Sequence, residues 1–299
     1  MSDHDRPGPG HHHGHDSVHP DWEMLGPDLE RGAELYTPLY EQAASWLREA
    51  ATGAVPGGVR RVLDIGSGPG VVSCLLARAF PDAEVVAADA TGALLERARD
   101  RAARLGLADR VHTQLAEVPD GLDALGGADL IWSSKALHHV GDQRAAVAAL
   151  AGHLRPGGLL ALAEGGLTPR FLPRDLGIGR PGLQSRLDVA GEEWFSEMRA
   201  ALPDTVDETE DWPAFLADAG LHAPGTRSFL LDLPAPLSAD ARAYVVTLLS
   251  RACEMYGDRL DEEDRTALAR LTDPEDAAGI TRRPDAFFLS AQTVHTARA

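Results

Sequence analysis

The chain of 299 residues carries 46 acidic and 28 basic residues, a formal net charge of −18 and 44% hydrophobic residues. This composition is typical of a globular protein with one or two domains, and the acidic balance disfavours proteins that hold nucleic acid or anionic membranes through their overall field. Two cysteines cannot build a disulfide framework, and no apolar run approaches the roughly 20 residues of a membrane span. We therefore expect a cytoplasmic protein without nucleic-acid or membrane partners.

The first segment, residues 1–27, contains half of the twelve histidines and almost no apolar side chains. Such a segment cannot bury a core, so we expect a disordered tail. His-rich tracts can bind metal ions, but we assign no metal site here. Residues 28–57 follow helical spacing up to Ala51 and then become glycine-rich, which predicts one helix, or a pair broken at Pro38, and a linker.

From residue 58 onwards, apolar runs alternate with amphipathic helical patterns. Strands are expected at residues 59–65, 84–88, 110–114, 128–133 and 159–164. Helices are expected at residues 70–80, 91–105 and 142–154. Strands that are separated by helices indicate an α/β fold with a parallel, doubly wound sheet.

After residue 165 this alternation becomes less regular. Helical patterns cover residues 191–202, 211–219, 239–256 and 261–271, and strand patterns cover residues 228–233 and 286–296. We find no internal repeat. These residues are expected to complete the sheet and to add helical insertions to it.

The most informative segment is Asp64-Ile65-Gly66-Ser67-Gly68-Pro69-Gly70, where an apolar strand runs into a glycine turn and a helix. Glycines let the backbone approach a ligand closely, and a helix N-terminus offers free N–H groups. A dinucleotide fingerprint, G-x-G-x-x-G, would need glycine where Val71 stands. The acid before the loop suits a ligand with a positively charged amine better than a pyrophosphate. Asp89 ends the second strand, where doubly wound folds place a carboxylate against ribose hydroxyls.

These motifs, with residues 128–132 and 154–158, resemble those of the class I S-adenosylmethionine-dependent methyltransferases over about residues 58–166. The resemblance implies a Rossmann-like, mostly parallel sheet of seven strands and S-adenosylmethionine as the cofactor. It also implies that the glycine loop lies beneath the methionine part and that Asp89 holds the ribose. The cofactor-binding residues that we expect are Asp64, Gly66, Ser67, Gly68, Gly70, Asp89, Ala90, Ala116, Glu117 and Ser133.

The segment after the third strand departs from the family pattern. Relatives usually carry Gly-Asp-Ala-Glu there, whereas this chain has Gln114-Leu115-Ala116-Glu117, so Leu115 replaces the acid near the adenine. The Ala116 backbone and Glu117 are the remaining candidates for adenine contact. Residues 136–140 and 154–158 are most similar to small-molecule methyltransferases, and Ser133-Ser134-Lys135 replaces the Pro-Pro-aromatic stretch of nucleic-acid amino-methyltransferases.

His138 and His139 follow the fourth strand, at the edge where open α/β sheets bind ligands. Either histidine is a candidate general base that deprotonates an acceptor, and local packing is the alternative for both. The leading hypothesis is methyl transfer to a small organic acceptor at an oxygen nucleophile, a phenol or a carboxylate. The alternatives are a C- or N-methyltransferase of a small metabolite and a non-catalytic cofactor-binding protein of the same fold.

The resemblance implies that the sixth strand is parallel and the last antiparallel to the others. Residues 166–210 and 234–285 then leave from the carboxyl edge of the sheet, so we expect both to cover the cofactor together with residues 28–57. The chain would consist of a binding core, residues 58–165, and a remainder, residues 166–299, whose insertions form the acceptor pocket. Neither insertion contains a motif that names the acceptor or the oligomeric state.

Several side chains are candidates for lining this pocket. The aromatic candidates are Tyr36, Tyr40 and Trp132, whose rings could face a sulfonium, with simple core packing as the alternative. The candidates for attracting an anionic acceptor are Arg170, Arg174, Arg180 and Arg186, with a solvated surface as the favoured alternative. Lys135 is the only lysine, so arginine is simply frequent in this chain.

Overall fold

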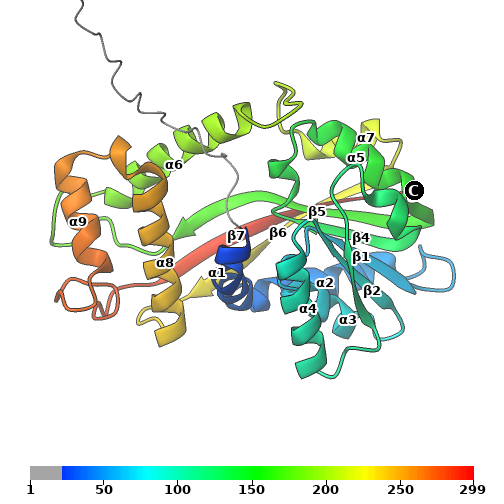
Figure 1. Ribbon diagram of the computed structural model, residues 1–299, viewed down its shortest axis with the longest axis horizontal. Coiled ribbons are helices and arrows are strands. Elements are labelled where there is room, and N and C mark those ends of the chain that lie inside the picture. Colours follow the sequence, from blue (N-terminus) through cyan, green and yellow to red (C-terminus); the bar gives the residue numbers. More distant parts are fainter. Residues whose placement is uncertain (1–21) are drawn as a thin grey trace, which may run out of the picture.

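A computed structural model of the protein describes residues 22–299. Its strands are β1 (Arg61–Ile65), β2 (Glu84–Asp89), β3 (Val111–Leu115), β4 (Ala128–Ser134), β5 (Leu154–Arg170), β6 (His222–Leu233) and β7 (Phe288–Arg298). They form one sheet in the order β3-β2-β1-β4-β5-β7-β6 (Figure 1). Strand β7 runs antiparallel to β5 and β6, and the other neighbouring strands are parallel. The predicted doubly wound, mostly parallel seven-stranded sheet is confirmed.

Helices cover both faces of this sheet. They are α1 (Trp22–Leu35), α2 (Thr37–Ala51), α3 (Val71–Ala79), α4 (Gly92–Arg104), α5 (Gln143–Gly152), α6 (Leu183–Ala200), α7 (Trp212–Asp218), α8 (Ala239–Tyr256) and α9 (Glu262–Thr272). Helices α2, α3 and α4 lie on one face and α5 and α7 on the other (Figure 1). Because strand side chains alternate between faces, Trp132 joins the hydrophobic cluster on the α3 side and Ile131 the cluster on the α5 side.

Strands β5 and β6 extend beyond the predicted boundaries, since β6 begins at His222 instead of Ser228. The predicted fifth strand covers residues 159–164, but β5 begins at Leu154 and continues to Arg170 through an irregularity at Gly165 and Gly166. The backbone of both glycines has positive φ, and pairing with β7 resumes at Gly166 opposite Gln292. The antiparallel partner therefore carries β5 past the break in its apolar pattern.

The N-terminal helix begins earlier than predicted. Helix α1 starts at Trp22, so residues 22–27, which we expected in the disordered tail, are helical; the rest of that tail lies outside the described residues. Contacts with α4 explain the correction: Gly26 lies against the Leu94 and Arg97 side chains, and Glu30 forms an ion pair with Arg101 at 2.6 Å. The chain then turns between α1 and α2, where Pro38 occupies the first turn of α2, which agrees with the predicted pair of helices.

Helices α6, α8 and α9 gather beyond the end of the sheet where β5 finishes (Figure 1). Helix α6 begins at Leu183, earlier than the helical pattern around residues 191–202 indicated. Arg186 on α6 donates to both carboxylate oxygens of the buried Asp264 on α9, at 2.6 and 2.7 Å. This hydrogen bonding holds the pKa of Asp264 below its ordinary value and ties the two helices together.

The arginines of the segment after β5 have structural partners. Arg170 forms an ion pair with Asp188, and Arg180 forms ion pairs with Asp261 and Asp264. The same carboxylate of Asp264 also binds Arg186. Three of the four arginines that we considered for attracting an acceptor therefore hold the helical insertions together instead.

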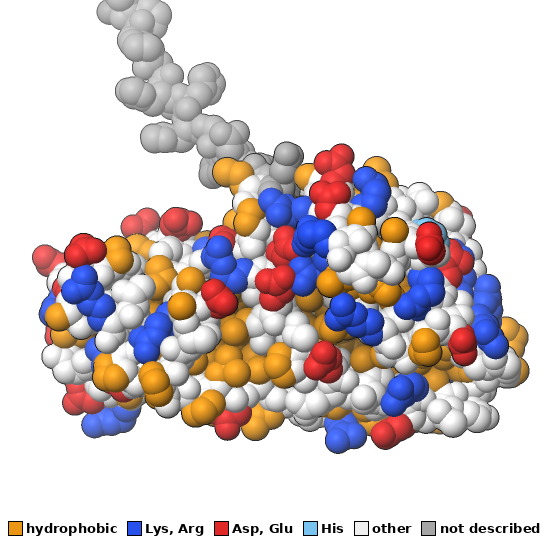
Figure 2. Space-filling view, turned by 90° about the horizontal axis from the view of Figure 1, so that it is seen from below, with side chains coloured by type: hydrophobic (Ala, Val, Ile, Leu, Met, Phe, Trp, Pro, Cys, Tyr) orange, Lys and Arg blue, Asp and Glu red, His pale blue; other side chains and the backbone are white. Residues whose placement is uncertain are grey.

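Charges of both signs are mixed on the surface that α2, α3 and α4 present. Figure 2 shows basic and acidic side chains interspersed over this face, with hydrophobic side chains exposed near its middle. Among the residues that the structure describes, no helix combines the length and the apolar character needed to cross a membrane.

Candidate active site

A cavity of about 540 Å³ lies at the carboxyl ends of β1, β2 and β4. Its floor consists of the glycine loop after β1, Asp89 at the end of β2, and the segment after β4. Its other walls come from α1, α2 and α8 and include Tyr36, which directly precedes α2, with Tyr40 and Tyr244. The cavity therefore lies where open α/β sheets bind ligands, and helices from both ends of the chain enclose it.

The insertion between residues 166 and 210 contributes no lining residue to this cavity. It supports the wall from behind, because the ring of Phe195 lies 5.7 Å from that of His138. Arg199 of α6 also donates to the carbonyl oxygen of His138 at 3.0 Å. Of the three segments that we expected to cover the cofactor, the N-terminal helices and the segment containing α8 thus line the cavity, and residues 166–210 do not.

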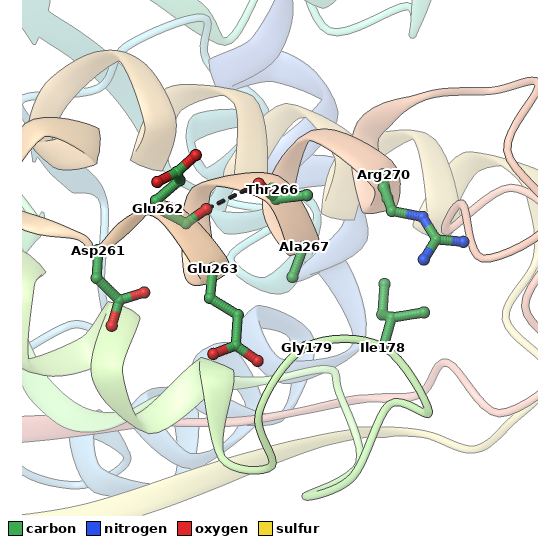
Figure 3. A pocket seen from close by; sticks show the side chains of 8 residues that line it. All are labelled: Ile178, Gly179, Asp261, Glu262, Glu263, Thr266, Ala267 and Arg270. Carbon is green, nitrogen blue, oxygen red and sulfur yellow. Dashed lines mark hydrogen bonds between the residues drawn. The ribbon is translucent and has the colours of Figure 1, made fainter.

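A second hollow lies over α9 and has a different character. Figure 3 shows three carboxylate side chains, Asp261, Glu262 and Glu263, around one end of it, and Arg270 at the other. Asp261 and Glu263 form ion pairs with Arg180. Since these carboxylates serve the packing of the insertion, we place the functional site in the cavity at the sheet edge.

The glycine loop is shaped by close approach of neighbouring elements. At Gly66 φ is +68°, and a Cβ atom there would lie 2.4 Å from the Ala136 Cβ. At Gly70, the left-handed N-cap of α3, a Cβ atom would lie 2.5 Å from the Ala98 Cβ. Both positions therefore require glycine, the first to seat the segment after β4 and the second to pack α3 on α4.

The end of β2 is fixed to this loop by its carboxylate. Asp89 accepts hydrogen bonds from the Gly68 N–H at 2.9 Å and from the Thr91 N–H at 2.8 Å. A side chain added at Gly68 would meet nothing within 4 Å, so the loop presents bare backbone beside the carboxylate. Such a surface can accept hydroxyl groups of a ligand that lies across the loop.

Two buried polar atoms of the cavity wall have no hydrogen-bond partner within the described part of the chain. They are the Ser67 Oγ in the glycine loop and the Trp132 Nε1 on β4. A buried polar group without a partner costs free energy, and binding sites are one place where such groups are retained. Both atoms are therefore candidates for ligand contact.

Asp64 is buried beneath the glycine loop. Burial raises the pKa of its carboxyl group to about 7, the charge of Asp89 adds to this shift, and a 2.5 Å hydrogen bond from the Ser73 Oγ opposes it. An acid held in this way gains most from a cationic ligand group, because the ligand charge would offset the desolvation of the carboxylate.

The raised pKa of Asp64 predicts a specific pH dependence of stability. The folded protein holds this proton more tightly than the unfolded chain, so the free energy of unfolding falls as the pH rises from about 4 to about 7. Asp64→Asn removes this loss and is expected to raise the free energy of unfolding at pH 8 by up to about 4 kcal/mol. Ser73→Ala, which removes the opposing hydrogen bond, is expected to lower it. Urea unfolding at pH 5 and pH 8 measures both, and equal pH dependence in all three proteins would contradict the assignment.

A buried carboxylate organises the segment after β4. Glu164 Oε1 accepts hydrogen bonds from the N–H groups of Ala136 and Leu137, both at 3.0 Å. Glu164 Oε2 lies 3.0 Å from the Nδ1 of His138, within the short 3₁₀ helix Leu137–His139. With Nδ1 donating to the carboxylate, the Nε2 of His138 is left as the acceptor nitrogen, as in a carboxylate–histidine pair that abstracts a proton.

His139 has a different environment, although it also lines the cavity. Its ring packs edge-on against Trp22 of α1 with 5.0 Å between ring centroids, and it lies 4.2 Å from the ring of His138. The structure therefore favours packing for His139 and acid–base chemistry for His138.

Most of the predicted site residues meet in this one cavity. Those that line it are Asp64, Gly66, Ser67, Gly68, Asp89, Ala90, Ala116, Glu117, His138 and His139. Gly70 and Ser133 do not: Gly70 serves helix packing, and the Ser133 side chain lies fully buried, while its neighbour Ser134 lines the cavity. Leu115, which replaces the family's acid, is 60% exposed and also lies outside the lining.

Sequence reasoning missed three kinds of residue here. It treated Glu164 only as a strand end, although an acid at the carboxyl end of the strand beside β4 could have been recognised. It noted Lys135 as the only lysine without placing it in the site, where it lines the cavity. It gave no role to Tyr244 and Arg251 of α8, which lie more than 170 residues after the glycine loop and carry no local motif.

Known proteins resemble the chain in this same region. Residues 62–158 match a family model described as a methyltransferase domain. The trans-aconitate 2-methyltransferase of Methylobacterium radiotolerans is 31% identical over 237 residues, which cover 71% of this chain and 85% of that protein. Methyltransferase GfsG of Streptomyces halstedii is 34% identical, with 69% of this chain and 66% of that protein covered. An uncharacterized protein of Synechococcus sp. is 41% identical over 110 residues, and the chain spans only 26% of its length.

Proposed function

Since the chain belongs to the class I S-adenosylmethionine-dependent methyltransferases, we propose that it transfers a methyl group to an oxygen of a small organic acceptor. The observation that carries this proposal is the cavity that joins the glycine loop and Asp89 to the Glu164–His138 pair. The relative named trans-aconitate 2-methyltransferase supports it, because its name denotes a carboxylate acceptor.

The residues present fit S-adenosylmethionine. The buried carboxyl of Asp64 would face the amino group, Asp89 would accept from the ribose hydroxyls, and the unpartnered Ser67 Oγ is available to the methionine part. Ala116 and Glu117 line the side of the cavity that remains for the adenine. When bound, the cofactor supplies a methyl group on a positively charged sulfur, which a nucleophile takes up by in-line displacement.

The chain's own residues would prepare the acceptor. Glu164 holds the His138 ring through Nδ1, so that Nε2 can accept the proton of an acceptor hydroxyl, whereas a carboxylate acceptor is already ionised at pH 7 and needs no base. The charge of Glu164 would stabilise the imidazolium that results. Tyr36 and Tyr40 of the N-terminal helices and Tyr244 of α8 enclose the cavity, and we propose that they exclude water from the reacting groups.

The test is a transfer assay with S-adenosylmethionine that carries a deuterated methyl group. The protein is incubated with a panel of phenols and carboxylic acids, together with matched amines and carbon acids, and products are identified by mass spectrometry. We expect the label on oxygen in at least one phenol or carboxylic acid. Label only on nitrogen or carbon would overturn the assignment of the acceptor atom, and no label on any compound would contradict the proposed activity.

A further inference from the structure

One cation inside the cavity has no carboxylate partner among the described residues. Lys135 follows β4 directly, and its Nζ lies 4.2 Å from the centroid of the Tyr36 ring. The side chain lines the cavity and is exposed there. An aromatic face compensates a positive charge only in part, so an ammonium that faces a cavity in this way favours an anion beside it.

The buried carboxylate whose charge acts on Lys135, that of Glu164, already has other partners. Glu164 Oε1 accepts hydrogen bonds from the N–H groups of Ala136 and Leu137. Its Oε2 faces the Nδ1 of His138. Partial desolvation by the cavity walls lowers the pKa of Lys135 to about 8, and the charge of Glu164 opposes this shift. At pH 7 the group is therefore still mostly protonated and cationic, and it forms no ion pair with Glu164.

The backbone holds this lysine in place. Lys135 has φ of +52°, a left-handed conformation that side chains other than glycine rarely adopt. Its N–H donates to the carbonyl oxygen of Ala163 on β5, and the next two N–H groups donate to Glu164. Hydrogen bonds to β5 thus hold Lys135 in this strained backbone conformation, and strained residues of this kind are common at functional sites.

The choice of residue also differs from the rest of the chain. All 27 other basic residues are arginines, and Lys135 is the single lysine. Arginines elsewhere bind carboxylates of the protein with two nitrogens, as Arg186 does with Asp264. A lysine instead offers a compact point charge on a flexible stem, which suits a ligand that enters and leaves.

We propose that Lys135 binds a carboxylate of the acceptor and so selects carboxylate-bearing molecules as substrates. The inference deepens the proposed function and rests on it. The ammonium lies on the same short segment as His138, so a carboxylate held by Lys135 brings the acceptor to the wall where that base lies. Besides Lys135 and the two histidines, the cavity lining contains one further basic side chain, that of Arg251. Its guanidinium forms an ion pair with the Asp28 carboxylate at 3.5 Å.

The single lysine makes a direct test possible. The full chain, saturated with S-adenosylhomocysteine, is treated with the uncharged reagent N-succinimidyl acetate, and acetylation of Lys135 is followed by peptide mass spectrometry. The α-amino group of the chain serves as the internal reference. Added compounds are aliphatic and aromatic mono- and dicarboxylates, including trans-aconitate, each paired with its amide.

We expect at least one carboxylate to slow acetylation of Lys135 about tenfold at saturating concentration, without slowing the reference amine, and its amide to slow it less than about twofold. Protection by amides or neutral phenols to the same extent, or protection by no carboxylate, would overturn the inference. Calorimetry with S-adenosylhomocysteine on the same sample separates the two proposals. Binding without protection refutes only the role of Lys135, whereas no binding refutes the proposed function.

Variants test the role during turnover. Lys135→Gln is expected to raise the KM of the carboxylate acceptor by about 20-fold and to leave kcat within about threefold, because a charge-assisted contact to the ground state is lost. Lys135→Arg keeps the charge and is expected to restore most of the affinity. Arg48→Gln, at an exposed position on α2, is the matched control for loss of one positive charge. A purely structural role predicts instead that the glutamine and arginine variants lose thermal stability and cofactor affinity alike.

Discussion

Replacement of Asp89 by alanine is expected to weaken S-adenosylmethionine binding by about 100-fold, or roughly 2.8 kcal/mol. Two effects contribute. The variant loses the carboxylate that would accept from the ribose hydroxyls, and such charge-assisted hydrogen bonds are stronger than neutral ones. It also leaves the N–H groups of Gly68 and Thr91 without their acceptor, which frees the glycine loop. Isothermal titration calorimetry measures the change.

Two further variants make this prediction specific. Asp89→Asn keeps an oxygen for one of the backbone N–H groups but loses the charge, so we expect an intermediate affinity. Asp82→Ala removes an exposed carboxylate seven residues earlier, before β2, and should bind like the unchanged protein. If Asp89→Ala binds within about threefold of the unchanged protein, the assignment of the ribose site to Asp89 is wrong.

Loss of the Glu164–His138 pair is expected to have the second large effect. His138→Gln should lower kcat for a hydroxyl acceptor such as a phenol by about 10² to 10³, because a positioned general base contributes a factor of this size. Glu164→Gln keeps the shape of the side chain but removes its negative charge. The amide therefore binds the His138 Nδ1 and the two backbone N–H groups less well than the carboxylate does. We expect it to lower kcat by about tenfold or more and to move the pH dependence of kcat.

The two histidines are separated by matched variants. His139→Gln should retain most of kcat because its ring packs on Trp22, and His112→Gln, at an exposed position of β3, should be neutral. S-adenosylhomocysteine affinity is measured for each variant, so that a loss of cofactor is not taken for a loss of the base. Equal losses of kcat in the His138 and His139 variants would contradict a unique role of the Glu164–His138 pair.

Local patterns were sufficient to predict the sheet and most of the flanking helices. The alternation of apolar strands with amphipathic helices is strong between residues 58 and 165, and the glycine loop marks one strand–helix junction unambiguously. Predictions failed where tertiary contacts decide. Pairing with β7 carries β5 through Gly165 and Gly166, and contacts with α4 extend α1 back to Trp22.

The candidate site shows the same division. The sequence located the loop and Asp89 because each has a characteristic position relative to a strand. It did not distinguish Ser133 from Ser134, since one residue of register decides which side chain of a strand faces the cavity. It also did not pair Glu164 with His138, which are 26 residues apart along the chain, because their contact depends on the pairing that places Ser134 at the end of β4 opposite Ala163 of β5.

The measurement that tests the central claim most directly is a calorimetric titration of the unchanged chain with S-adenosylmethionine, S-adenosylhomocysteine and NADH. The proposed site predicts saturable binding of the first two compounds, with one site per chain, and no heat of binding for NADH. The acid at Asp64 before the loop and Val71 in place of a third fingerprint glycine both favour this outcome. Saturable binding of NADH without binding of S-adenosylmethionine would contradict the account of the glycine loop and of the cavity above it.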